Sequence, residues 1–221
     1  MTNSPIIDYS KKPSSYFEGC RTDFVEALPD NPEGSILEIG CAYGSTGALA
    51  LKRGKCRRYV GVEINPAVAE IARSQLTEVL TANVEEVDLP FPESSFNALI
   101  LSEVLEHLID PWATVERLSR LVKPGGLVFA SSPNISHYSV IGDLIKGKWV
   151  LTDRGVMDRT HLRWFTPILF TELFDRSGFD VYRVEPVTPF ASRTRIINQL
   201  TGSRFRHLFM RQICIHGRKR P

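Results

Sequence analysis

The sequence predicts a doubly wound α/β fold, in which a mostly parallel sheet is covered by helices on both faces. Short apolar runs alternate along the chain with amphipathic stretches, as they do in consecutive βαβ units. A glycine-rich turn separates the first apolar run from the first amphipathic stretch, and folds of this class bind ligands at such turns. The chain has 221 residues, of which 43% are hydrophobic and 24% charged, so we expect one globular domain over residues 1–221.

The predicted strands are apolar runs bounded by glycine, proline or polar residues. The runs SILEIG, RYVGVEI and FNALILS are rich in residues that favour strands, and GLVFASS follows a Pro-Gly-Gly turn. The shorter run EVLTAN and two later runs, FDVYRVEPV and FMRQICIHGRK, would bring the sheet to seven strands. The expected ranges are 35–40, 58–64, 78–83, 96–102, 126–132, 179–187 and 209–219.

Each predicted helix carries a start or a stop signal. Asn65, Asp110 and Thr166 can each cap a helix, and each precedes a proline that suits the first helical position. Gly54 and Gly178 supply stop signals for two of the helices. The expected ranges are 45–54, 65–76, 110–122 and 166–178.

Two segments do not follow this alternation. Between residues 133 and 165 the periodicity lapses, and the stretch is rich in glycine, aromatic and charged residues. It is too long for an ordinary connection, so we expect a functional insertion after the fifth strand. Residues 189–208 give no clear pattern.

Charge is distributed unevenly along the chain. The net charge is +2, but no acidic residue follows Glu185, whereas eight of the 27 basic residues do. This basic C-terminal segment, 189–221, predicts contact with an anionic partner such as a membrane surface, a phosphate or a nucleic acid. The alternative interpretation is a solvated tail.

The composition also indicates a compartment. The four cysteines are scattered and form no CxxC pair, which is typical of reduced intracellular thiols. No apolar run approaches the ~18 residues of a membrane span, and the N-terminus lacks a signal pattern. We therefore expect a cytoplasmic protein, with peripheral contact to the inner face of the membrane as a further hypothesis.

The stretch ILEIGCAYGSTGALA, at 36–50, carries the first chemical signal. Its pattern G-x-x-x-G-x-x-G differs from the dinucleotide fingerprint, and it lacks the Lys-Ser/Thr pair of a phosphate loop. Glu38 lies inside the predicted strand, so it needs a cationic or hydrogen-bonding partner. Glu63 ends the next strand, where a carboxylate can accept hydrogen bonds from ribose hydroxyls.

Four motifs in order resemble class I S-adenosylmethionine (SAM) dependent methyltransferases. LEIGCAYG is similar to their first motif and GVEIN to the second, while LTANVEEVDLPFPESSFNALILSEVLEHL and LVKPGGLVFASSPN resemble the later ones. The resemblance covers most of the chain and implies the seven-stranded Rossmann-like methyltransferase fold. It also implies an N-terminal helical lid over 8–30, with Tyr16 or Arg21 near the cofactor carboxylate.

The resemblance implies which residues hold SAM. The loop 40–44 would line the methionine moiety, Glu38 would lie near its amino group, and Glu63 would bind the ribose. Asn83 stands where the family usually has Asp, although an amide oxygen can still accept the adenine N–H. The full cofactor set is Glu38, Gly40, Cys41, Ala42, Gly44, Gly47, Glu63, Ile64, Asn83, Val84 and Ser102.

The stretch SSPNISHYSVIGDLIKGKW, followed by DRGVMDRTHLRWFT, resembles a subgroup associated with glycosyltransferases and surface-polysaccharide biosynthesis. This resemblance implies a sugar or glycan acceptor, bound by the insertion, and a glycosyltransferase as a partner. Tyr138, Trp149 and Trp164 could stack on sugar rings, or they could pack the insertion. The chain shows no RNA-binding module, so nucleic acid is not expected.

The stretch SEVLEH groups Glu103, Glu106 and His107 at helical spacing, which would place all three on one face. Together with His161, these residues resemble the metal ligands of ubiquinone-pathway and small-RNA methyltransferases, and they suit Mg²⁺, Mn²⁺ or Zn²⁺. A metal-free site is a second interpretation, with His107 or His161 as general base beside Glu103. A structural role is the third.

The expected reaction is O-methylation of a sugar hydroxyl on a polysaccharide or a glycan precursor, with SAM as methyl donor. The alternatives are a small-molecule or quinone-type O-methyltransferase, an RNA ribose 2′-O-methyltransferase, and a non-catalytic SAM-binding partner of a glycosyltransferase.

Overall fold

A computed structural model describes residues 14–221, which divide into two compact units. Unit 1 ends at Leu89, and unit 2 runs from Pro90 to Pro221. Of the expected N-terminal lid, residues 8–13 lie outside the described residues. The remainder contains a 3₁₀ turn, η2 (Ser14–Tyr16), and a short helix, α1 (Thr22–Ala27).

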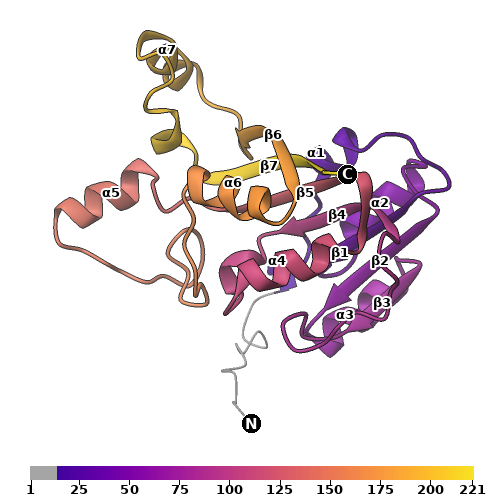
Figure 1. The fold of residues 1–221 in the computed structure, drawn as a ribbon. Coiled ribbons are helices and arrows are strands. Elements are labelled where there is room, and N and C mark those ends of the chain that lie inside the picture. The colour runs from indigo at the N-terminus through magenta and orange to yellow at the C-terminus, as the bar shows by residue number, and fades with distance from the viewer. Residues whose placement is uncertain (1–13) are drawn as a thin grey trace. The chain divides into compact units, whose positions relative to one another are not determined.

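Unit 1 contains three parallel strands in the order β3-β2-β1 (Figure 1). Its strands are β1 (Ser35–Ile39), β2 (Arg58–Glu63) and β3 (Glu78–Thr81), and its longer helices are α2 (Ser45–Lys52) and α3 (Pro66–Arg73). The predicted cap of α3 is confirmed, because the Asn65 side chain accepts a hydrogen bond from the Ala67 N–H at 3.0 Å.

Unit 2 contains one parallel and two antiparallel strand pairs. Strand β4 pairs parallel with β5, whereas β7 pairs antiparallel with both β5 and β6. The strands are β4 (Phe96–Ser102), β5 (Val122–Pro133), β6 (Phe179–Pro186) and β7 (Gln212–Lys219). The helices and 3₁₀ turns are η3 (Leu105–His107), α4 (Pro111–Ser119), α5 (Tyr138–Ile145), α6 (Pro167–Arg176), α7 (Ser192–Leu200) and η4 (Arg206–Phe209).

The strands belong to one seven-stranded sheet in the order β3-β2-β1-β4-β5-β7-β6. The prediction of a mostly parallel, doubly wound sheet is therefore confirmed, and β7 accounts for its antiparallel part. The strands are buried because their runs are almost continuously apolar; in β4, for example, Leu99, Ile100 and Leu101 are all fully buried.

The insertion returns to the point where it began. An isolated bridge joins Asn134 to Phe165, and the Ile135 N–H donates to the Phe165 carbonyl at 3.0 Å. The insertion also contains a helix, α5, which its lapsed periodicity did not predict. The segment 134–165 is therefore a closed excursion between β5 and α6.

The basic C-terminal segment is not a solvated tail, and that interpretation is wrong. Its first part forms α7 and η4, and its last part forms β7 inside the sheet. Two of the terminal arginines have partners, since Arg218 donates to the Gly125 carbonyl at 2.9 Å and Arg220 to Asp180 at 3.0 Å. Among residues 14–221, no helix is both long and apolar enough to cross a bilayer.

Candidate functional site

The glycine-rich loop of unit 1 has an unusual backbone. Gly40, Ala42 and Gly44 all adopt positive φ, at 70°, 50° and 82°. Glycine tolerates this conformation at little cost, whereas at Ala42 it is strained and must be stabilised by neighbouring contacts. The loop therefore turns sharply between β1 and α2 and presents main-chain atoms at the end of the strand.

Close packing fixes the helix that follows this loop. A Cβ atom at Gly47 would lie 2.4 Å from Leu76 and 2.5 Å from Tyr59, so only glycine lets α2 approach β2 this closely. Gly61 is equally constrained, because its Cβ would lie 2.5 Å from the Cys41 sulfur. These distances give Gly47 a role in packing helix against strand, which its place in the glycine-rich motif also implies.

Glu63 is buried at the end of β2 and is held by the loop. Its carboxylate accepts hydrogen bonds from the Ala42 N–H at 3.1 Å and from the Asn65 N–H at 2.9 Å. Burial raises the pKa of Glu63, although these backbone donors act against the shift. Each carboxylate oxygen retains acceptor capacity, so the expected ribose hydroxyls fit this position.

Glu38 is buried inside β1, and its hydrogen-bonding partner is a phenol. The Tyr59 hydroxyl donates to Glu38 at 2.8 Å. Burial raises the pKa of Glu38 to about 8, while the Tyr59 hydrogen bond and the Arg21 guanidinium act in the opposite direction. Arg21 itself pairs with Asp23 at 2.7 Å.

We expect the affinity for SAM to fall as the pH decreases from about 8 toward about 6. If Glu38 lies near the cofactor ammonium group, as the resemblance implies, its ionised carboxylate attracts that group, but below its raised pKa the free protein increasingly holds a proton there. Binding must release that proton, which weakens affinity by up to about tenfold per pH unit. Calorimetric titration with SAM at several pH values measures this decrease in affinity, which is the acidic limb of the pH profile. Glu38→Gln should remove the limb, and a flat profile in the unmodified protein would contradict the assignment.

The remaining residues expected to bind the cofactor occupy two places. In unit 1, Ile64 is exposed after β2, Val84 is buried after β3, and the Asn83 side chain accepts from the Glu85 N–H at 3.1 Å. Part of the acceptor capacity of Asn83 is thus used by a local turn. In unit 2, Ser102 ends β4, and its hydroxyl oxygen lies 3.3 Å from that of Ser131.

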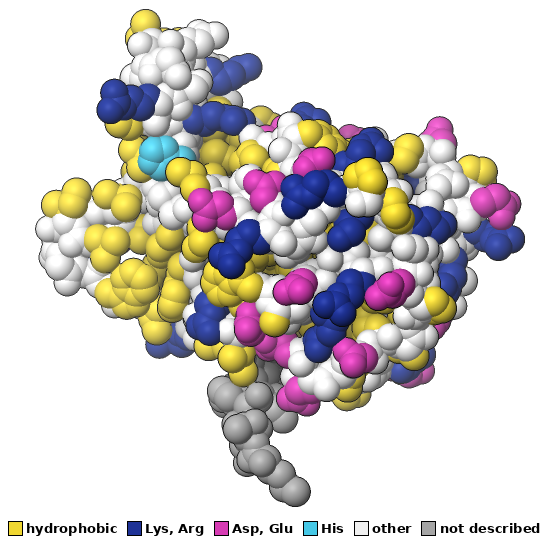
Figure 2. All heavy atoms as spheres, viewed as in Figure 1, with side chains coloured by type: hydrophobic (Ala, Val, Ile, Leu, Met, Phe, Trp, Pro, Cys, Tyr) yellow, Lys and Arg dark blue, Asp and Glu magenta, His cyan; other side chains and the backbone are white. Residues whose placement is uncertain are grey.

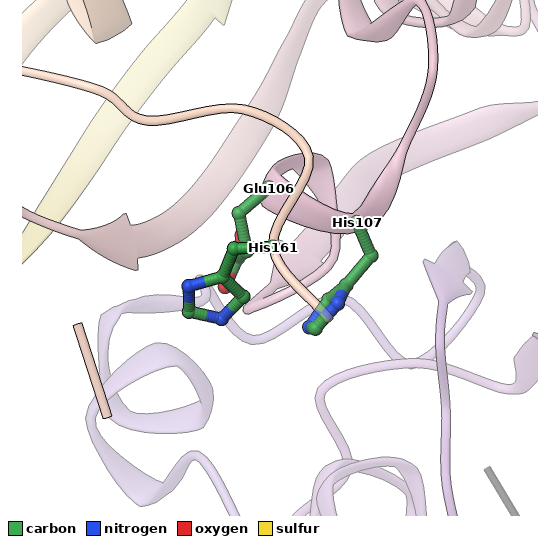
Figure 3. A group of neighbouring side chains, drawn as sticks. All are labelled: Glu106, His107 and His161. Atoms are coloured by element: carbon green, nitrogen blue, oxygen red, sulfur yellow. The ribbon is translucent and has the colours of Figure 1, made fainter. Parts of the chain in front are cut away.

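Unit 2 brings three of the predicted polar residues together. Potential ligand atoms of Glu106, His107 and His161 all lie within 4.8 Å of one another. The two imidazole rings meet edge to face, with centroids 4.9 Å apart. Figure 3 shows these side chains side by side, two from η3 and one from the insertion.

Backbone hydrogen bonds hold the insertion against η3. The Leu162 N–H and the Arg163 N–H both donate to the Glu106 carbonyl, at 2.7 Å and 3.0 Å. His161 directly precedes these two residues, so the same contacts place its ring beside Glu106 and His107. Sequence separation therefore gives no measure of proximity at this site.

Both histidines have a defined tautomer. The His107 Nδ1 lies 3.1 Å from the Thr160 carbonyl, and the His161 Nδ1 lies 3.1 Å from the Val156 carbonyl. A carbonyl oxygen only accepts, so Nδ1 carries the proton in each ring. In the neutral rings Nε2 is then the acceptor atom, as in metal-binding or proton-accepting histidines.

Glu106 is the most deeply buried member of the group, with 1% of its surface exposed. One carboxylate oxygen accepts from the Ser132 hydroxyl at 3.1 Å, while the other is buried without a hydrogen-bond partner. Burial, together with the nearby Glu103 and Asp158 carboxylates, raises the pKa of Glu106 well above its usual range. An unsatisfied buried carboxylate oxygen beside two imidazoles fits a divalent cation, which would displace the carboxyl proton.

Glu103 does not share a helical face with the other two residues, and that prediction is wrong. The 3₁₀ turn covers only Leu105–His107, and Glu103 precedes it with a positive φ of 54°. Its carboxylate accepts instead from the Gln212 amide at 2.9 Å. A left-handed residue breaks the helical spacing, so the side chain leaves the face on which the motif would place it.

A second group on β6 and β7 was not predicted. Ligand atoms of Glu185, Cys214 and His216 also lie within 4.8 Å of one another. The Arg183 guanidinium donates to Glu185 at 2.9 Å, and a fixed cation there opposes the binding of a metal ion. This group is therefore the weaker metal candidate. Cys214 and His216 are two positions apart in a predicted strand, so the sequence could have shown that they share one face of the sheet.

Comparison with curated proteins yields relatives that are named methyltransferases. A ubiquinone biosynthesis O-methyltransferase of Xanthomonas campestris pv. campestris (strain B100) is 29% identical over 133 residues, covering 58% of this chain and 54% of the relative. A probable S-adenosylmethionine-dependent methyltransferase of Mycolicibacterium smegmatis is 27% identical over 146 residues, covering 66% and 52%. The chain thus spans about half the length of the curated relatives it matches.

Solved structures show the same fold. A SAM dependent methyltransferase from Archaeoglobus fulgidus aligns with a TM-score of 0.66 at 22% identity, covering 96% of this chain and all of that one. One from Mesorhizobium loti aligns with a TM-score of 0.63 at 16% identity, covering 89% and 96%. The family described as methyltransferase domain matches residues 14–184. The chain therefore belongs to this methyltransferase-domain family and has the fold of solved SAM-dependent methyltransferases.

Proposed function

We propose that the enzyme transfers the SAM methyl group to a hydroxyl oxygen. The buried group of Glu106, His107 and His161 carries this proposal. A hydroxyl is a poor nucleophile, and its oxygen must lose a proton as it attacks. A site built from two imidazoles and a carboxyl group of raised pKa suits that requirement. The names of the Xanthomonas and similar relatives also support transfer to oxygen.

Each residue of the group has its own role in the proposed reaction. SAM, when bound, supplies an activated methyl group, so the protein mainly positions the acceptor and accepts its proton. His107 and His161 present Nε2 acceptors whose orientation the Thr160 and Val156 carbonyls fix. Glu106, His107 and His161 would together hold a divalent cation, which would lower the pKa of a bound hydroxyl. Without a cation, one histidine acts as general base.

For the acceptor we propose a sugar hydroxyl of a glycan or its precursor. The insertion offers aromatic surface for such a ring, because Trp149 is exposed and stands edge to face with Trp164 at 5.4 Å. Tyr138 is also exposed. The second candidate acceptor is a quinone-type phenol, which the names of the relatives favour. A glycosyltransferase partner remains part of the glycan proposal.

A transfer assay with labelled SAM tests the reaction and the cation together. Purified enzyme is incubated with cell-envelope glycan precursors and, separately, with catechol-type phenols. We expect label in an oxygen-linked methyl group and loss of activity after exhaustive chelation, with recovery on adding Mg²⁺ or Mn²⁺. Activity that ignores the chelator and rises with pH along a histidine titration would show the metal-free base instead. Label only on nitrogen or carbon acceptors would contradict the proposal.

A further inference from the structure

The insertion exposes an unusual amount of apolar surface. In α5, Tyr138, Ile141 and Ile145 follow helical spacing on one outward face. The apolar segment, defined as residues 138–151, exposes seven large hydrophobic side chains: Tyr138, Ile141, Leu144, Ile145, Trp149, Val150 and Leu151. Single exposed hydrophobic residues are ordinary, but a continuous set of this size marks an interaction surface.

A second exposed apolar element lies in the basic C-terminal segment. Ile196, Ile197 and Leu200 of α7 are exposed, Leu200 to 82%. Two exposed arginines, Arg193 and Arg195, precede these residues on the same helix. Figure 2 shows hydrophobic side chains gathered over α5 and the chain that follows it, and Lys and Arg side chains over α7.

Within unit 2, the insertion is held to η4, the 3₁₀ turn that follows α7 in the chain. The Asn134 amide donates to the carbonyls of His207 and Met210, both at 2.7 Å. The Tyr138 ring, at the start of α5, lies 6.1 Å from the Phe209 ring of η4. Because Asn134 is fully buried and donates two hydrogen bonds, the start of the insertion is held against η4 and the residue that follows it.

We propose that the apolar segment and α7 form a surface that docks on an anionic lipid membrane. The combination of aromatic and basic side chains on this surface supports a membrane as the partner. Trp149 and Tyr138 suit the boundary between headgroups and acyl chains, and Lys146 and Lys148 can extend toward lipid phosphates. No acidic residue follows Glu185, so α7 contributes attraction to anionic headgroups.

The competing partner is a second copy of this chain. Two such surfaces would bring like-charged α7 helices together, which disfavours self-association. Docking without spanning agrees with the length of α5, which has 8 residues. Tyr138 and Trp149 also serve the proposed glycan site, but binding to a vesicle requires neither an acceptor nor a cation, so membrane docking can hold or fail independently of the proposed reaction.

Vesicle co-sedimentation with the full chain tests the proposal. Ile145 is 82% exposed in the apolar segment, and Ile168 is 73% exposed on α6, outside it. Ile145→Glu is expected to weaken partition onto phosphatidylglycerol-containing vesicles by about tenfold or more, since it loses the burial of one large apolar side chain. Ile168→Glu is the matched control and should bind as the unmodified protein does. Neither exposed substitution should change the unfolding midpoint.

Charge supplies an independent arm of the experiment. Arg193→Glu should weaken binding to anionic vesicles by about fivefold or more, and added salt should weaken binding of the unmodified protein. Equal binding of the Ile145→Glu and Ile168→Glu variants would overturn the proposal, as would absence of binding at low salt. If light scattering shows that Ile145→Glu dissociates a dimer and neither form binds vesicles, the surface is a protein interface and the proposal is wrong.

Discussion

His161→Ala is expected to lower kcat for methyl transfer by about 10²- to 10⁴-fold, the range over which general acid–base groups contribute. The reason holds for both forms of the site. The substitution removes the Nε2 atom beside Glu106 and His107. That atom is needed whether it binds a cation or takes the proton from the substrate hydroxyl. Steady-state kinetics with saturating SAM measures the effect.

The control is His207→Ala. His207 is exposed on η4, and the hydrogen bond that it accepts from Asn134 uses its backbone carbonyl, which alanine retains. The His207→Ala variant should have a kcat close to that of the unmodified protein. Affinity for SAM should be unchanged in both variants, because the expected cofactor residues of unit 1 are untouched. If His161→Ala lowers the unfolding midpoint but leaves kcat intact, the group is structural and the proton leaves by another route.

Glu63→Ala is expected to weaken SAM binding by about 2 to 4 kcal/mol, the loss of two charge-assisted hydrogen bonds. This corresponds to roughly 30- to 1,000-fold in the dissociation constant. The structure adds a second reason for the loss. The same carboxylate holds the Ala42 N–H and the Asn65 N–H, so the substitution also releases the strained loop. Isothermal titration with SAM gives the affinity directly.

Two further variants show whether the loss of SAM affinity is specific to Glu63. Glu70→Ala removes a carboxylate from the exposed face of α3, where it pairs with Arg73, and should leave SAM binding unchanged. Glu63→Gln keeps one oxygen acceptor and should fall between the unmodified protein and Glu63→Ala. An affinity of Glu63→Ala equal to that of the Glu70→Ala control would mean that the ribose is bound elsewhere.

The sequence predicted the regular elements because their signals are local. The cap at Asn65 and the proline after it start a helix wherever the rest of the chain lies. The continuous apolar run of β4 predicts a buried strand, and its observed bounds, Phe96–Ser102, match the prediction. The glycines of the loop are equally local, since positive φ and close packing exclude most other residues at Gly44 and Gly47.

Local signals failed where distant contacts decide the structure. Charge alone left a solvated tail as one interpretation of residues 189–221, whereas antiparallel pairing with β5 and β6 places the predicted last strand inside the sheet as β7. Helix α5 lacked a clear pattern because its outward face is apolar rather than polar.

The candidate site shows the same division. The sequence by itself identified Glu106, His107 and His161 as residue types suited to a cation or a proton. Only the tertiary structure brought His161 to the pair, through the backbone hydrogen bonds of residues 162 and 163 to the Glu106 carbonyl. It also removed Glu103 from the shared face, because a positive φ redirects that residue toward Gln212. The type of each residue can be read from the sequence. Which residues lie close together depends on which distant backbone groups form hydrogen bonds with each other.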